Sequence, residues 1–61
     1  MLYEFKELVY SHFIGSHIQI IVHPSHYLAI IDHKIAICQS RSSGWIGVYD
    51  EHGELLHVLR T

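Results

Sequence analysis

The chain has 61 residues, of which 49% are hydrophobic and 16% are charged, and its formal net charge is −2 with the histidines neutral. A chain this short and this apolar predicts one small folded domain, residues 1–61, and argues against intrinsic disorder. The basic residues are too few and too scattered for binding driven by nucleic-acid phosphates; they are Lys6, Lys34, Arg41 and Arg60.

The N-terminal segment carries Glu4 and Glu7 and does not have the positive start of a secretory signal peptide. No apolar run approaches the roughly 20 residues that a membrane-spanning helix needs. Cys38 is the only cysteine, so the chain cannot form an intramolecular disulfide, and the residue is read mainly as a small buried hydrophobe. These features predict a cytoplasmic protein with no membrane partner.

The first thirteen residues have the apolar spacing of an amphipathic helix of about three turns. Its apolar positions are Leu2, Phe5, Leu8, Val9 and Phe13. Glu4 and Glu7 lie near the start, where the helix dipole favours acids, and Gly15 is suited to end the helix. A β-rich start is the alternative, because residues 9–14 also include β-branched and aromatic side chains.

From residue 17 onward the pattern changes to short strands separated by turns. The predicted strands are 17–23, 27–31, 35–38, 45–50 and 55–59. Pro24 and Ser25 form the first turn, Asp32 to Lys34 the second, and the polar segment 39–44 a longer loop. Gly53 lies in the last turn.

The predicted fold is α+β: a short N-terminal amphipathic helix followed by a four- or five-stranded antiparallel meander. One helix can cover only one side of such a sheet, yet strands 27–31, 35–38 and 55–59 carry apolar side chains on both sides. Two arrangements would bury this surface: the sheet curls strongly into a small barrel, or its open side meets a second copy of the chain. Both outcomes favour a homo-oligomer, and a two-fold homodimer is the commonest closed form.

The best candidates for recognition are Arg41, Trp45 and Tyr49, since these residue types are enriched at binding hot spots. The alternative, of equal weight, is that Trp45 and Tyr49 pack the second face of the sheet or a dimer interface. Three histidines at the turns, His23, His26 and His33, are candidates for a pH-sensitive rim.

The histidines could also hold a metal, because His23 and His26 have ligand-like spacing and zinc accepts imidazole. They belong to different strands and match no recognised zinc pattern, so no metal or other cofactor is expected. Ser25, His26 and Asp32 supply the residue types of a catalytic triad without a nucleophile elbow. We therefore expect a non-enzymatic protein.

Two segments resemble the Sm-like RNA-binding barrels, which also have a helix followed by five short strands. Ile14-Gly15 precedes the first strand as in that family, and residues 32–37 are similar to its Asp-x-x-Met-Asn-Leu segment. The resemblance implies a small barrel that binds RNA or single-stranded nucleic acid. Ala36 stands where that family has a base-contacting Asn, and the later Arg-Gly signature is absent.

The sequence thus predicts a small non-enzymatic regulatory or inhibitory protein that acts on a protein partner, as a homodimer. An Sm-like nucleic-acid-binding barrel is the alternative, and a histidine-based metal-binding protein is a weaker one.

Overall fold

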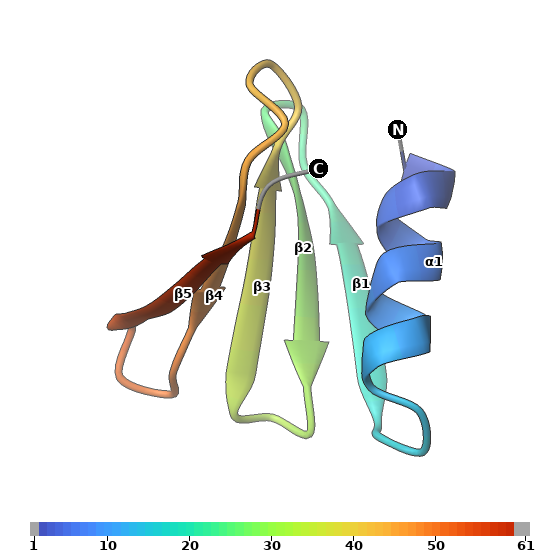
Figure 1. The fold of residues 1–61 in the computed structure, drawn as a ribbon, viewed down its shortest axis with the longest axis vertical. Coiled ribbons are helices and arrows are strands. Elements are labelled where there is room, and N and C mark those ends of the chain that lie inside the picture. The colour runs from blue at the N-terminus through green and yellow to red at the C-terminus, as the bar shows by residue number, and fades with distance from the viewer. Residues whose placement is uncertain (1, 60–61) are drawn as a thin grey trace.

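The computed structural model describes residues 2–59 and consists of one helix and one sheet (Figure 1). Helix α1 (Leu2–His12) is followed by five strands: β1 (Ile18–Val22), β2 (His26–Ile31), β3 (Ile35–Ser40), β4 (Ile46–Tyr49) and β5 (Leu55–Leu59). This is the predicted α+β fold. The strands begin and end within two residues of their predicted limits, and the third is longer, since it continues through Ser40.

The sheet is a pure antiparallel meander, in which each strand pairs with its neighbours in sequence, in the order β1-β2-β3-β4-β5. Strands β1 and β5 are its two edges and do not pair with each other, so the sheet is twisted but does not close into a barrel. Two turns lie at one end of the sheet, while the β1–β2 turn and the β3–β4 loop lie together at the other (Figure 1). We call this second end the loop end.

Helix α1 covers one face of the sheet and buries Phe5 and Val9 against it. The buried side chains of the strands come from alternate positions of β2, β3 and β4, as the two-residue period of a strand requires. They are Tyr27, Ala29, Ile31, Ile37 and Ile46. The prediction of an amphipathic N-terminal helix is therefore confirmed, and the β-rich start is wrong.

The opposite side of the sheet has no covering element among the described residues, and we call it the open face. It is apolar from edge to edge, because the register places apolar side chains from all five strands there. These residues are Ile21, Leu28, Ile30, Ala36, Cys38, Trp45, Gly47, Tyr49, Leu56 and Val58. The two-sided apolar pattern of the strands thus leaves one side of the sheet uncovered.

The turn between β2 and β3 places two non-glycine residues in the left-handed region, Asp32 at φ 51° and His33 at φ 59°. Two successive residues with positive φ give a turn whose twist matches that of a hairpin, and Lys34 completes the three-residue connection between the paired residues Ile31 and Ile35. The turn is closed by the Lys34 amide, which donates to the Ile31 carbonyl at 3.0 Å. The Asp32 carboxylate oxygen Oδ1 accepts from the His17 amide at 2.8 Å, which ties the turn to the start of β1.

Helix α1 ends as the sequence predicts. The amide of Ser16 donates to the carbonyl of Phe13, and Gly15 adopts φ 88° at the reversal of the chain. Within residues 2–59, no helix is both long and apolar enough to cross a membrane.

Candidate functional site

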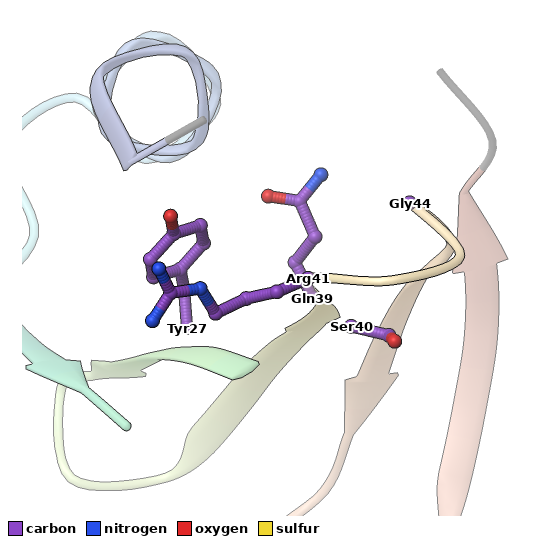
Figure 2. Close-up of a pocket in the computed structure, with 5 residues that line it drawn as sticks. All are labelled: Tyr27, Gln39, Ser40, Arg41 and Gly44. Atoms are coloured by element: carbon purple, nitrogen blue, oxygen red, sulfur yellow. The ribbon is translucent and has the colours of Figure 1, made fainter. Parts of the chain in front are cut away.

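A small cavity of about 210 Å³ lies at the loop end, on the helix-covered side of the sheet (Figure 2). Its lining comes from the start of β2, the end of β3 and the following loop, namely Tyr27, Gln39, Ser40, Arg41 and Gly44. The pairing of Tyr27 with Gln39 across β2 and β3 brings the two polar-tipped side chains side by side on one face. Strand register therefore builds this cavity from residues that are distant in sequence.

Arg41 is fixed to the β1–β2 turn through both its backbone and its side chain. Its amide donates to the Ser25 carbonyl at 3.2 Å, and its Nη1 donates to the His23 carbonyl, also at 3.2 Å. The guanidinium carbon lies 5.0 Å from the centre of the Tyr27 ring, a distance typical of a cation–π contact. These three contacts hold one positive charge at the mouth of the cavity.

Tyr27 is itself held from the other side by the helix. The ring of Phe5 lies 5.8 Å from the Tyr27 ring, centre to centre, at an interplanar angle of 34°. Packing against Phe5 and Arg41 leaves the Tyr27 side chain buried. The floor of the cavity is therefore a rigid aromatic surface and not a mobile loop.

Gln39 is the unusual member of the site. It is only 9% exposed, and its carboxamide oxygen Oε1 is buried without a hydrogen-bond partner among the described residues. Figure 2 shows the carboxamide standing up from the sheet beside Arg41, with its oxygen on the side of Tyr27. Leaving a buried polar atom unpaired costs on the order of 1–3 kcal/mol, so such an atom in a cavity indicates a place where a partner can bind.

Of the three predicted recognition residues, only Arg41 belongs to this cavity. Trp45 and Tyr49 lie on the open face, where both side chains cover Gly47. A Cβ atom added to Gly47 would lie 2.7 Å from Cζ3 of Trp45 and 2.8 Å from Cε1 of Tyr49. The structure thus places these two aromatic residues on the second face of the sheet and separates them from Arg41.

The three rim histidines divide between the two ends of the sheet. His23 and His26 stack with ring centres 4.5 Å apart at the loop end, and the hydroxyl of Ser25 lies within 3.0 Å of Nδ1 of each ring. His33 lies at the opposite end and stacks instead on His17 at 5.1 Å. His33 therefore does not approach the His23 and His26 pair.

The residue types of a triad do not assemble, because Asp32 lies at the far end of the sheet from Ser25 and His26. Across residues 2–59, no three or more His, Cys, Asp or Glu side chains are close enough together to hold a metal ion.

A second cavity, of about 330 Å³, opens between the last turns of α1 and strands β3 to β5. Its lining is almost wholly apolar apart from His12 and His57. It lies where the single helix leaves the β5 side of the sheet uncovered.

Comparisons with protein-family models, with curated proteins and with solved structures give no match for this chain. Its function must therefore be argued from its own geometry.

Tyr27 and Gln39 were not among the predicted site residues. Both occupy inward positions of otherwise apolar strands, and a polar side chain at such a position is the signal that could have identified them.

Proposed function

We propose that this chain is a small non-enzymatic regulatory or inhibitory protein that acts by protein–protein contact and functions as a homodimer. The open face of the sheet carries the proposal, because it is apolar across all five strands. Among the described residues, the polar side chains of this face lie at its margin and are Gln19, His26 and Ser40. An apolar centre with a polar rim is the usual composition of a protein interface.

The size of the open face supports an interface. Five strands spaced about 4.8 Å apart and about five residues long cover roughly 400 Å² in projection. Two such faces together bury roughly 800 Å² in projection, and the relief of the side chains raises this area toward the roughly 1,200 Å² at the lower end of specific interfaces.

The shape of the open face favours a second copy as its occupant. The central strand presents the small side chains of Ala36 and Cys38, whereas the neighbouring β2 presents Leu28 and Ile30. A two-fold axis parallel to the strands and between β2 and β3 would set the large side chains of each copy over the small ones of the other. Two twisted sheets pack in this aligned manner about 10 Å apart.

The charge distribution supports the same occupant. Within residues 2–59 the open face carries no charged side chain, so a partner with a charged surface would have to desolvate its charges without gaining an ion pair from these residues. A second copy brings an equally uncharged face, and a two-fold arrangement pairs the two polar rims as well. Self-association therefore satisfies both the apolar centre and the rim.

Analytical ultracentrifugation of the wild-type chain and of two lysine variants tests the proposal. Ile21 lies on the open face and is 48% exposed, so Ile21→Lys adds a charge there with little disturbance of the folded monomer. Ile14 is 86% exposed in the segment between α1 and β1, off the open face, and Ile14→Lys is the matched control. Circular dichroism verifies that both variants fold.

The wild type and Ile14→Lys are expected to sediment as dimers at micromolar concentration, and Ile21→Lys to dissociate at least about tenfold more readily. A wild-type chain that stays monomeric at about 100 μM would overturn the proposal. If the two lysine variants dissociate equally, the open face is not the dimer interface.

A further inference from the structure

We propose that the cavity at the loop end binds the C-terminal carboxylate of a partner polypeptide, with Arg41 pairing the carboxylate and Gln39 pairing the last peptide group. This inference rests on the proposed action through protein contact and names the chemistry of the partner. The cavity lies on the helix-covered side, away from the open face, so a dimer formed through the open face leaves it accessible.

Gln39 supplies the first part of the argument. Its buried Oε1 atom has no hydrogen-bond partner among residues 2–59, although it lies in a polar cavity beside Tyr27 and Arg41. The last torsion of a glutamine side chain is broad, so rotation can present either the carboxamide oxygen or its NH₂ group to the cavity. The site can therefore accept from an N–H group or donate to an oxygen of the same ligand.

Arg41 supplies the second part. Its contacts with the His23 carbonyl and the Tyr27 ring fix one face and one nitrogen of the guanidinium. A guanidinium has five N–H donors, and the single side-chain bond to His23 uses one of them. The donors that remain suit a carboxylate, which guanidinium groups bind in a planar, two-bond geometry.

The distribution of charge along the sheet supports an anionic ligand at this end. Four of the six acidic side chains lie in the turns at the opposite end, namely Asp32, Asp50, Glu51 and Glu54. The other two, Glu4 and Glu7, are on α1. Arg41 lies at the loop end and Lys34 in the β2–β3 turn at the other, so within the sheet and its turns the excess of acidic side chains lies away from the cavity.

A peptide C-terminus combines the two required groups at the required separation. Its carboxylate and the N–H of the same residue are joined by one carbon atom, and the cavity of about 210 Å³ has room for a terminal residue with its peptide group. An isolated carboxylate would leave the carboxamide oxygen of Gln39 unpaired. An internal peptide segment would leave Arg41 without an anion.

Three small probes separate these contributions. Acetyl-Gly-Gly has both the carboxylate and the terminal N–H, its C-terminal amide lacks the charge, and acetyl-Gly-sarcosine lacks that N–H. Titrations are followed by ¹H–¹⁵N correlation spectra, through the Gln39 side-chain NH₂ and the Gly44 amide. We expect acetyl-Gly-Gly to bind with a Kd on the order of 1 mM, and each of the other probes at least about tenfold more weakly.

Variants identify the residues. Gln39→Met keeps the length of the side chain and removes its polar atoms, so it should abolish probe binding and also raise the urea midpoint, because a buried unpaired atom is gone. Arg41→Gln should weaken acetyl-Gly-Gly at least about tenfold and leave the amide probe unchanged. Lys34→Gln, which removes a cation at the opposite end, is the matched control and should bind as the wild type does.

Equal affinity for acetyl-Gly-Gly and its amide, or no spectral change up to about 20 mM probe, would overturn the inference. A lower urea midpoint in Gln39→Met would also contradict it, since Gln39 would then be a structural residue. Dimerisation is read separately by sedimentation. Probe binding that is retained in monomeric Ile21→Lys would show that the site works without the homodimer. Absence of probe binding in a chain that remains dimeric would mean that this site fails while the homodimer stands.

Discussion

Cys38 lies directly opposite Gly47 across strands β3 and β4, at the centre of the open face. On its other side Cys38 faces Leu28 of β2, so its thiol is surrounded by apolar groups within the sheet. Burial raises the pKa of this thiol above its ordinary value. The only cysteine of the chain is therefore a natural probe of whatever covers the open face.

The first prediction concerns alkylation of Cys38. Because the thiolate is the reactive form and the pKa is raised, iodoacetamide should react with the folded chain more slowly than with the urea-unfolded chain. The proposed homodimer would cover Cys38, so the rate should fall further as the protein concentration rises through its dissociation constant. Mass spectrometry of timed samples measures both effects.

Ile21→Lys provides the control for this experiment, since a chain that stays monomeric should be alkylated at one rate over the whole concentration range. A wild-type rate that does not depend on concentration would mean that no second copy covers Cys38.

The second prediction concerns the loss of stability at alkaline pH. With a raised pKa, the folded chain keeps the Cys38 proton at a pH where the unfolded chain has lost it, so stability falls as pH rises. The contribution is complete below the ordinary value of 9.0 and is lost above it. Two chains are compared, both carrying Ile21→Lys: one keeps Cys38 and the other also carries Cys38→Ala. Between about pH 7.5 and about pH 9.5, the urea midpoint should fall more in the chain that keeps Cys38.

Subtracting the Cys38→Ala series cancels the titration of the tyrosines and lysines, which both chains share. If the urea midpoints of the two chains change equally with pH, folding does not raise the pKa of the Cys38 thiol.

The third prediction concerns Gly47, whose backbone is covered by the rings of Trp45 and Tyr49. A methyl group at this position would lie 2.7 Å from Cζ3 of Trp45, 2.8 Å from Cε1 of Tyr49 and 2.9 Å from the Tyr49 hydroxyl oxygen, so both side chains must turn aside. Since these atoms are at the far ends of the rings, the cost of Gly47→Ala should be near the lower end for overpacking, about 1 kcal/mol of unfolding free energy. Urea denaturation measures it.

A double-mutant cycle tests the cause. Adding Gly47→Ala to Trp45→Ala should cost less than adding it to the wild type, because one of the two rings is already absent. An equal cost in both backgrounds would place the effect in the backbone.

The fourth prediction concerns the strained turn between β2 and β3. His33→Gly should stabilise the chain by about 0.5 kcal/mol, because glycine adopts positive φ without the penalty that a side chain brings, and this gain exceeds the loss of the stack on His17. Asp32 is left in place, since it accepts from the His17 amide. Thermal and urea unfolding should agree on the sign.

Gly15→Ala is the reverse substitution, because it places a side chain where glycine now adopts positive φ. Gly15 has φ 88° and no atom within 4 Å of an added methyl group, so only backbone strain can act, and a loss of about 1 kcal/mol is expected. A destabilised His33→Gly chain would show that the histidine stack outweighs the strain.

Local sequence patterns were sufficient to predict the elements and their order. The spacing from Leu2 to Phe13 predicted the helix, and the alternation from residue 17 onward predicted the strands and which residues share a face. In the structure, Ile46 and Val48 lie on the helix-covered face, and Trp45 and Tyr49 lie on the open face.

The site could not be predicted in the same way, because it depends on pairing between strands. Arg41 was expected beside Trp45 and Tyr49, its near neighbours in sequence, but the alternation of β4 sends those rings to the other face. Tyr27 and Gln39 come together only because β2 and β3 pair in one particular register. A shift of a single residue would place both on the open face.

The meander order of the sheet also determines how the chain can fold. Each strand pairs only with the strand before it and the strand after it, so every hairpin closes over a short loop. Sheets with such local pairings fold faster than sheets whose strands meet across long stretches of chain. The chain is therefore expected to fold faster than a sheet of the same size whose strands are joined by crossover connections.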